Sequence, residues 1–236
     1  MQEKQASSQG RTFRPSDTNE KASFLAHHAL FQDLDEHARQ EVERLATLAN
    51  YAPGRILYRP GEAGTAFFLL MSGEVQLYHL SADGRKLITA TLTPGATFGE
   101  VPVFGMELHL SFAEVVSNAR LCVLNRYDLE TLLLHQPHIA RALLKILGHR
   151  AIQLEAQLTA IAFKGATARL AMLLLQLSSG SNRIEGLSHE ALAERLGVYR
   201  ETVSNSLREL RESGALEVGR KHVIIHNKSV LEMFTS

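Results

Sequence analysis

The stretch 187-LSHEALAERLGVYRETVSNSLREL-210 contains two short helical patterns joined at a glycine. Ser188 can begin the first helix, because its hydroxyl can accept a hydrogen bond from a free N–H of the first turn. Gly197 can form the turn, since a residue without a Cβ tolerates positive φ. The second helix carries an apolar row at spacings of four and three residues, formed by Val203, Leu207 and Leu210. Two helices joined by a short turn, with a polar outer face on the second, are typical of a DNA-reading helix-turn-helix.

The polar face of the second helix carries side chains that read base edges. Arginine pairs with guanine, glutamate accepts from the cytosine amino group, and asparagine pairs with adenine. Beyond this helix, two short apolar runs flank the turn Gly219-Arg220-Lys221, which predicts a hairpin wing with a basic tip that touches phosphate. A solvated helical hairpin is the alternative, but it does not explain why the cap, the turn, the buried row and the wing occur together. The predicted DNA-contacting residues are Tyr199, Arg200, Glu201, Ser204, Asn205, Arg208 and Lys221.

A narrow apolar seam runs along the segment before the helix-turn-helix. Its members are spaced alternately four and three residues apart, and they are Ala140, Leu144, Leu147, Ala151, Leu154, Leu158 and Ile161. This heptad pattern predicts a helix over residues 137–163 that pairs with a second copy of the chain. Packing of the helix on its own domain is the alternative, but a helix of roughly 25 residues with so narrow a seam favours the dimer. The predicted dimer interface consists of Leu144, Leu147, Ala151, Leu154, Leu158 and Ile161, and Phe163-Lys164-Gly165 is the predicted hinge.

Glycine-containing turns recur about every ten residues in the first half of the chain, as in folds built from short strands. These turns are Pro53-Gly54, Pro60-Gly61, Ser72-Gly73, Asp83-Gly84, Pro94-Gly95 and Phe104-Gly105. The runs between them predict strands at residues 55–58, 66–71, 74–80, 87–92 and 113–124. Asp83-Gly84 suits a hairpin, because both residue types tolerate positive φ. The pattern predicts a β-sandwich, roll or barrel, preceded by two short amphipathic helices within residues 23–49.

Composition excludes several classes of protein. The chain has 236 residues with 25 Lys+Arg and 25 Asp+Glu. Its net charge therefore gives no sign of a strongly charged partner. The longest apolar runs, at residues 66–71 and 170–175, are far shorter than the ~20 residues of a membrane helix. Residues 1–22 are polar, lack the apolar core of a signal peptide, and are predicted to form a flexible tail. We therefore expect a cytoplasmic protein that does not bind a membrane.

Cysteine and histidine give no metal or catalytic site. The single cysteine, Cys122, excludes an intramolecular disulfide and any iron–sulfur cluster or zinc site built on several thiolates. Its place in an apolar strand predicts a small core residue. His79 and His109 lack the inward His/His/Glu arrangement that a β-roll metal enzyme needs. We expect no metal, no cofactor and no enzymatic activity.

From about Phe24 to its end, the chain resembles the bacterial Crp/Fnr transcription regulators. The stretches that carry this resemblance are 68-FLLMSG-73, 94-PGATFGE-100 and 200-RETVS-204. The resemblance implies an α+β fold with a β-roll sensor domain of the cyclic-nucleotide-binding type at residues 23–136, a dimerisation helix at 137–163 and a winged helix-turn-helix domain at 164–236. It also implies a homodimer that binds a near-palindromic site in double-stranded DNA and contacts RNA polymerase. The resemblance implies a half-site related to TGTGA or TTGAT. Asn205 replaces an arginine of the family's reading helix, so the identity of the base that faces Asn205 is left open.

The same resemblance implies an effector pocket in the sensor domain. In the cyclic-AMP-binding members, a Gly-Glu pair holds the ribose, an Arg-Ser pair neutralises the phosphate and a Thr-Ser pair reads the adenine. The first pair is present here, whereas leucine replaces the arginine and Leu-Glu stands at the position of Thr-Ser. A buried phosphate without that arginine lacks a charge-assisted partner. The pocket residues so implied are Gly99, Glu100, Val101, Leu110, Ser111, Leu154 and Glu155.

We therefore predict that the protein does not bind cyclic AMP at micromolar affinity. The effector is either another small molecule or absent. The second candidate function is a cyclic-nucleotide-domain-like regulatory subunit that acts on a protein partner, and the third is a β-roll metal enzyme. The complete winged helix favours the DNA-binding regulator over both.

Overall fold

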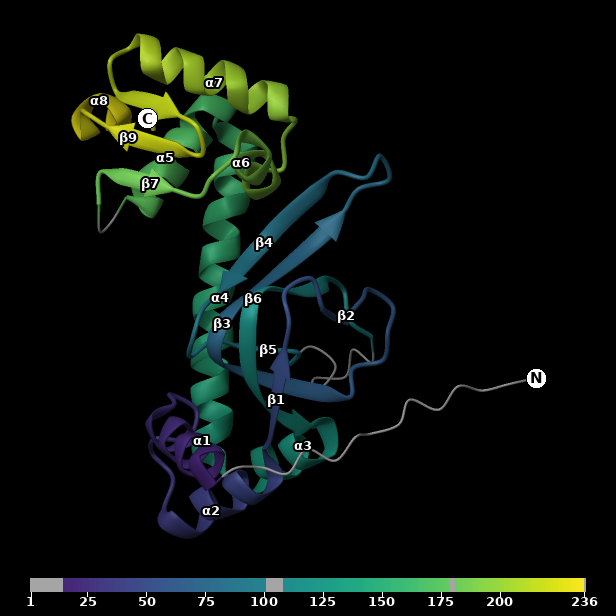
Figure 1. Cartoon of the computed structure of the whole chain (residues 1–236). Helices are drawn as coiled ribbons and strands as arrows, with labels where there is room; N and C mark the ends of the chain where they lie inside the picture. Colours follow the sequence, from purple (N-terminus) through teal and green to yellow (C-terminus); the bar gives the residue numbers. More distant parts are fainter. Residues whose placement is uncertain (1–14, 101–107, 179–180, 236) are drawn as a thin grey trace.

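The computed structural model of the chain describes residues 15–100, 108–178 and 181–235. Two lobes lie at opposite ends of one long helix, α4 (Pro137–Phe163) (Figure 1). The N-terminal lobe contains α1 (Pro15–His27), α2 (Glu36–Leu45), β1 (Thr47–Tyr51), β2 (Ile56–Tyr58), β3 (Ala66–Leu80), β4 (Lys86–Leu92), β5 (Thr97–Phe98), β6 (Phe112–Asn125) and α3 (Arg126–His135). The C-terminal lobe contains α5 (Ala166–Leu177), β7 (Arg183–Glu185), α6 (His189–Leu196), α7 (Arg200–Glu212), β8 (Leu216–Gly219), β9 (His222–Ile225) and α8 (Lys228–Met233).

The N-terminal sheet is antiparallel and has a hydrophobic core on each face. Its strand order is β1-β6-β3-β4, with β2 paired to β6 and β5 paired to β3. Successive side chains of a strand point to opposite faces. Phe67 and Leu69 accordingly pack with the helices α1 to α4, whereas Phe68 and Leu70 pack with β2, β5 and β6 in the interior of the sheet. The sheet therefore encloses one core and covers a second, in agreement with the predicted roll.

One predicted turn is absent. Ser72-Gly73 does not separate two strands, because β3 runs unbroken from Ala66 to Leu80. The pairing register of β3 with β6 shifts on both sides of Gly73, as at a β-bulge. Gly73 has φ +89°, and a Cβ there would lie 2.4 Å from the Asn118 carbonyl oxygen. The glycine thus serves a bulge at a close approach of two strands, and the prediction of a turn is wrong.

The predicted flexible tail is also too long. Helix α1 begins at Pro15, so the prediction is wrong for residues 15–22, and residues 1–14 lie outside the described part of the chain. The Lys21 ammonium donates to the carbonyl oxygens of Glu43 at 2.7 Å and Ala46 at 3.0 Å. These carbonyls lie at the end of α2, where backbone acceptors lack helical partners and a cation is favourable. A polar residue therefore anchors the segment that its composition marks as unstructured.

The C-terminal lobe forms around α5, α6, α7 and a small sheet of order β7-β9-β8. Its core joins the helices to the hairpin and includes Leu174, Leu192, Leu207 and Val223. Helix α7 lies along the top of this lobe (Figure 1). Strand β4 of the β3–β4 hairpin contacts α6, and the Leu87 side chain of β4 lies against Gly197, directly after that helix.

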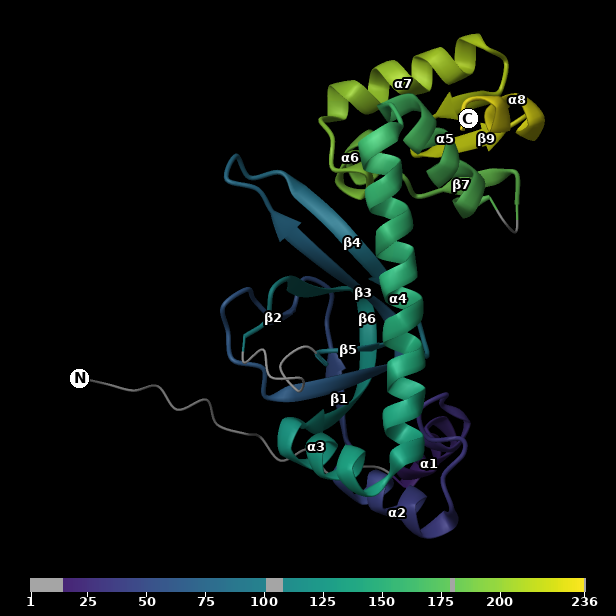
Figure 2. The ribbon, with the colours of Figure 1, turned by 180° about the vertical axis from the view of Figure 1, so that it is seen from behind.

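Helix α4 has the predicted bounds, Pro137 to Phe163. Its first turns are anchored in the N-terminal core through Ile139 and Leu143, which are fully buried. Seen from behind, the helix crosses the molecule with no other element in front of it (Figure 2). Within the described residues, neither α4 nor any other helix combines the length and the apolar character needed to cross a membrane.

Candidate DNA-binding and effector sites

The helix-turn-helix has the predicted local geometry. The Ser188 hydroxyl accepts from the Ala191 backbone N–H at 3.1 Å and begins α6. Gly197 ends this helix in the left-handed conformation, with φ 65° and ψ 34°. Helix α7 then buries its predicted row, Val203, Leu207 and Leu210. Because these three side chains fix α7 from below, its opposite face is held toward solvent.

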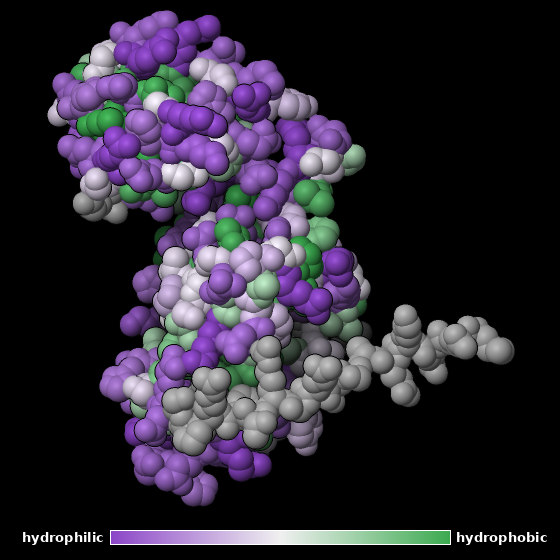
Figure 3. All heavy atoms as spheres, in the orientation of Figure 1, coloured by the Kyte–Doolittle hydropathy of each residue, from purple (hydrophilic) through white to green (hydrophobic). Residues whose placement is uncertain are grey.

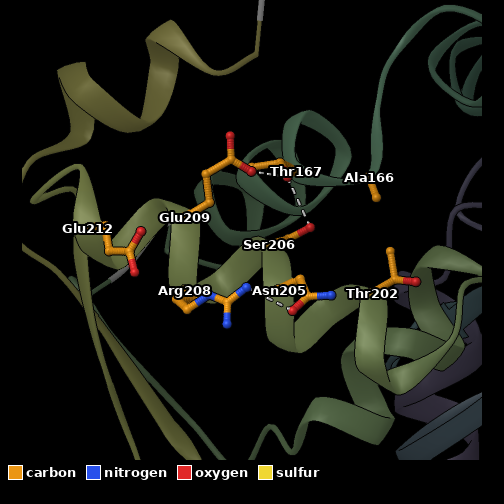
Figure 4. Close-up of a pocket in the computed structure, with 8 residues that line it drawn as sticks. All are labelled: Ala166, Thr167, Thr202, Asn205, Ser206, Arg208, Glu209 and Glu212. Atoms are coloured by element: carbon orange, nitrogen blue, oxygen red, sulfur yellow. Dashed lines mark hydrogen bonds between the residues drawn. The ribbon is translucent and has the colours of Figure 1, made fainter.

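The outer face of α7 carries the predicted reading residues. Arg200, Glu201, Asn205 and Arg208 are exposed. Arg208 donates to the Asn205 Oδ1 at 3.2 Å, which leaves the Asn205 amide NH₂ free to donate. Both side chains border a groove of about 420 Å³ between α5 and α7 (Figure 4). On the face shown in Figure 3, the C-terminal lobe is covered mainly by hydrophilic residues.

The floor of this groove is fixed by hydroxyl groups. Thr167, at the start of α5, hydrogen-bonds to Ser206 at 3.0 Å and to Glu209 at 2.7 Å (Figure 4). Ser206 is buried although it is polar, and this bond satisfies it. The contacts join the beginning of α5 to the middle of α7. Sequence reasoning did not find them, since Thr167 and Ser206 are distant in the chain.

The predicted wing is present as the β8–β9 hairpin. Lys221 lies at its tip with φ 60°, a conformation that costs energy in a residue with a Cβ. A cleft of about 260 Å³ separates the wing from the start of α6 and from Arg200 of α7. The cations Arg220 and Lys221 line this cleft together with Arg200. An anion would be attracted to this position.

Two predicted reading residues have partners in other elements of the protein. The Ser204 Oγ lies 2.8 Å from Nδ1 of His189 and donates to the Arg200 carbonyl oxygen at 3.1 Å. The Tyr199 hydroxyl donates to Asp83 at 3.2 Å, and the Arg85 guanidinium lies 4.6 Å from the centre of the Tyr199 ring. Tyr199 is therefore held by the tip of the β3–β4 hairpin. The contact between His189 and Ser204 was not predicted from the sequence. The sequence signal that could have indicated it is that His189 directly follows Ser188, the residue that caps α6.

In the N-terminal lobe, Glu100 forms the centre of the predicted effector pocket. Gly99 has φ +85°, and a Cβ there would lie 2.7 Å from the Ala66 carbonyl oxygen. Glu100 is 4% exposed, and its Oε1 pairs with the Arg150 guanidinium of α4. Arg150 also donates to the Thr97 carbonyl oxygen at 2.8 Å. Arg150 was not predicted, because fifty positions separate it from Glu100 in the chain.

Two buried oxygens beside this ion pair lack a hydrogen-bond partner among the described residues. They are the Glu100 Oε2 and the Thr97 Oγ1. Val101 lies outside the described residues. Leu110 is exposed, and Leu154 and Glu155 are exposed on α4. The structure thus brings Gly99 and Glu100 together with Arg150 and leaves these three predicted residues in solvent.

An aromatic pair lies close to Glu100. The rings of Tyr58 and His109 stack in parallel, with centroids 3.6 Å apart. Burial raises the pKa of Tyr58 well above its usual value, and the charge of Glu100 raises it further, whereas Arg150 and a hydrogen bond from Ser111 oppose the shift. Burial also lowers the pKa of His109. Both groups therefore remain neutral near pH 7 and fill the space next to the ion pair.

The predicted dimer seam is exposed for most of its length. Leu144, Leu158 and Ile161 are 66%, 67% and 53% exposed in the single chain, and Ala151 and Leu154 are exposed as well. Leu147 differs, because it is half-buried against the core of its own lobe. Nonpolar residues off the predicted seam are exposed too, among them Ile152 and Phe163. A row of large apolar side chains in water indicates an interaction surface.

Cys122 has the environment of a core residue. It is fully buried, its Sγ lies 3.5 Å from the Met71 sulfur, and burial raises the pKa of its thiol to about 12. The prediction of a small core residue is confirmed. Among the described residues, no three histidine, cysteine or carboxylate side chains are grouped so that they could hold a metal ion.

Comparison with known proteins agrees with this geometry. Residues 48–136 match the cyclic nucleotide-binding domain, and residues 168–234 match the Crp-like helix-turn-helix domain. The cyclic AMP receptor protein of Thermus thermophilus is 31% identical over 183 residues, which are 77% of this chain and 85% of that protein. A CRP-like cAMP-activated global transcriptional regulator of Mycobacterium tuberculosis is 26% identical over 88% of this chain and 96% of that protein.

Solved structures have the same fold. A putative regulator of the Crp/Fnr family from Eubacterium rectale superposes with a TM-score of 0.75 at 20% identity, covering 87% of this chain and 97% of that one. FixK2 from Bradyrhizobium japonicum superposes with a TM-score of 0.69 at 25% identity, covering 81% of this chain and 98% of that one. With its two matched domains and a relative above 30% identity, this chain belongs to the Crp/Fnr family of DNA-binding transcription regulators.

Proposed function

We propose that this regulator binds a near-palindromic site in double-stranded DNA as a homodimer, with α7 in the major groove and the wing on the backbone. The observation that carries the proposal is the exposed row Arg200, Glu201, Asn205 and Arg208 on a helix whose other face is buried. Base edges are read by such side chains, whereas phosphate contacts fix the position of the protein. Lys221 supplies a phosphate contact at the wing.

The exposed row on α4 supports the dimer. A parallel pair of α4 helices would bury Leu144, Ala151, Leu154, Leu158 and Ile161 against their copies. It would also place two reading helices about 34 Å apart, one turn of DNA, on a two-fold-symmetric site. We assign residues 23–136 to the sensor domain, 137–163 to the dimerisation helix and 164–236 to the DNA-binding domain. The protein would act in the cytoplasm and contact RNA polymerase at the promoter.

Cyclic AMP is not the proposed effector. The arginine that neutralises the cyclic phosphate in the cyclic-AMP-binding members is replaced by Leu110, which is 55% exposed. Arg150, the cation that lies beside Glu100, is already engaged by that carboxylate and by the Thr97 carbonyl oxygen. A cyclic phosphate would have to displace this pairing. Calorimetric titration with micromolar cyclic AMP is expected to give no heat of binding, and a clear isotherm would contradict the proposal.

Selection from random DNA tests the main proposal. Purified, ligand-free protein is incubated with a random duplex library, and the bound fraction is sequenced. We expect a two-fold-symmetric motif whose half-sites lie one helical turn apart, and the base facing Asn205 is then identified directly. Salt-sensitive binding without any motif would mean that DNA reading requires an effector. If the protein binds no DNA, either alone or in the presence of extracts that supply small molecules, the proposed function is contradicted.

A further inference from the structure

The hydrogen bonds of Ser204 determine which kind of atom it can offer to DNA. A serine hydroxyl has one hydrogen to donate and two lone pairs that accept. The Ser204 hydroxyl donates its hydrogen to the Arg200 carbonyl oxygen at 3.1 Å, and Nδ1 of His189 lies 2.8 Å from the Ser204 Oγ. Both contacts are hydrogen bonds when Nδ1 of His189 carries a proton and donates to Ser204. One lone pair of Ser204 then remains for a base edge.

This arrangement has a consequence for base selection. A free serine hydroxyl rotates and pairs with donors and acceptors alike. Ser204, with its hydrogen engaged by the helix backbone and one lone pair engaged by His189, presents an acceptor. It is therefore matched to an amino group, such as adenine N6 or cytosine N4. Without His189, this restriction is lost.

The same bond fixes the tautomer of His189. A neutral imidazole carries its proton on one ring nitrogen. With Nδ1 protonated, Nε2 of neutral His189 has a lone pair, which a phosphate oxygen would repel. A second proton turns Nε2 into a donor and gives the ring a positive charge. A phosphate near Nε2 thus favours the doubly protonated ring.

The surroundings of His189 supply a place for such a phosphate. His189 lines the cleft of about 260 Å³ between α6, the start of α7 and the wing. The charged or titratable groups that share this cleft are Glu190 on α6, Arg200 on α7, and Arg220, Lys221 and His222 on the wing. Outside the cleft, the hydrogen bond and charge of Arg183 lower the pKa of Glu185 on β7, and His222 contributes to the same shift. Three permanent cations against one carboxylate make the cleft attractive to a phosphodiester.

We propose that His189 is a specificity-determining residue of the DNA interface: it holds Ser204 as an acceptor and takes up a proton when a DNA phosphate occupies the cleft beside the wing. This inference rests on the proposed function, because it concerns the same helix-turn-helix.

The test measures operator affinity against pH with the full-length protein and the DNA motif recovered by selection. Fluorescence anisotropy between pH 5.5 and 8.5, at fixed ionic strength, gives Kd for the motif and for its variants. Wild-type affinity is expected to fall as pH rises, by up to about tenfold per pH unit, because uptake of one proton sets that limit. His189→Asn keeps a donor near the position of Nδ1 but cannot be protonated. It is expected to keep the base preference and to lose most of the pH dependence.

Three further variants separate the two roles. His189→Leu is expected to lose both the pH dependence and the preference at the base that Ser204 faces. Ser204→Ala is expected to lose the preference at that base and to keep the pH dependence. His226→Asn is the control, because His226 lies outside the cleft and contacts Glu217 at 3.3 Å. It is expected to bind like the wild type.

Several results would overturn the inference. Wild-type pH dependence in His189→Asn, or loss of the pH dependence in His222→Asn, would show that the proton goes elsewhere. An unchanged base preference in His189→Leu would show that Ser204 needs no positioning. If the wild type binds no sequence specifically at any pH, the proposed function itself fails, whereas specific binding without these effects contradicts the role of His189 alone.

Discussion

Glu201 and Lys221 make different kinds of contact in the proposed complex, and single substitutions can separate them. Glu201 lies on the outer face of α7, so Glu201→Ala is expected to relax selectivity at one base pair by about 1–3 kcal/mol. Lys221 lies at the tip of the wing with φ 60°. Lys221→Asn removes the charge with a residue type that tolerates this conformation. It is expected to weaken binding to all sequences and to reduce the salt slope by about one.

The measurement is Kd for the selected motif and for single-base variants, over a series of salt concentrations. Glu201→Ala is expected to leave the salt slope unchanged, and Lys221→Asn is expected to leave the order of the sequences unchanged. The same pattern for both variants would show that the assignment of α7 to bases and of the wing to phosphate is wrong.

Residues governed by local rules could be predicted from the sequence, and residues that depend on tertiary contacts could not. Ser188 and Gly197 were found because capping and positive φ depend on a few neighbouring positions. Arg150 was missed because its role follows from the packing of α4 against the loop that carries Glu100. A lone arginine on a long helix has no sequence signal that distinguishes it from a solvated one.

At the scale of single elements, strand β3 shows how one residue type serves two backbone purposes. Gly84 lies in the turn between β3 and β4, whereas Gly73 lies within β3 at its bulge. Both have positive φ, so the sequence signal is the same. What differs is the space around them: a Cβ at Gly73 would lie 2.4 Å from a backbone oxygen, and one at Gly84 would meet nothing within 4 Å. Sequence alone could not distinguish the bulge from the turn.

This difference predicts unequal effects of the same substitution. Gly73→Ala adds a clash with the β6 backbone to an unfavourable φ, and we expect it to destabilise the sensor domain by roughly 2–4 kcal/mol. Gly84→Ala is the matched control, with similar φ and open space, and about 1–2 kcal/mol is expected. Urea unfolding of both variants measures the free energies. An equal loss of stability would show that the close approach of the strands at Gly73 is not tight.

The seam of α4 was predictable because its heptad spacing persists over about three repeats. The exception within the seam, Leu147, has an intramolecular partner, and spacing alone cannot reveal which turn of a helix its own domain covers. Leu158, at 67% exposure, is therefore the sharper position for a test. Leu158→Glu places a charge in the proposed interface and is expected to yield monomers without loss of folding.

Sedimentation velocity of Leu158→Glu measures the oligomeric state, and circular dichroism checks the fold. Gln157→Glu is the control, since it adds the same charge at an exposed position next to the seam. We expect the control to remain dimeric and to bind the selected motif like the wild type. A dimer that persists in Leu158→Glu would place the interface elsewhere.

At the scale of the whole molecule, the hairpin of the sensor domain touches the beginning of the reading helix. Asp83 and Arg85 contact Tyr199, the residue directly before α7, and the Lys86 ammonium lies 3.9 Å from the Glu194 carboxylate of α6. The two residues joined by the Tyr199 hydrogen bond are 116 positions apart, and no pattern in the sequence predicts their contact. The start of α7 is thus held by contacts from the N-terminal lobe as well as by packing within its own lobe.

A double-mutant cycle on Arg85 and Tyr199 tests this dependence. An exposed cation–π contact contributes about 0.5–1 kcal/mol, so Arg85→Ala is expected to increase hydrogen exchange in α6 and at the start of α7 by about two- to fivefold. Tyr199→Leu keeps an apolar side chain without the aromatic face, and in this background Arg85→Ala is expected to have little further effect. Arg59→Ala is the control, because the ion pair of Arg59 with Glu62 lies within the sensor domain. Additive effects of the two substitutions, or equal exchange in the control, would show that the hairpin does not hold the reading helix.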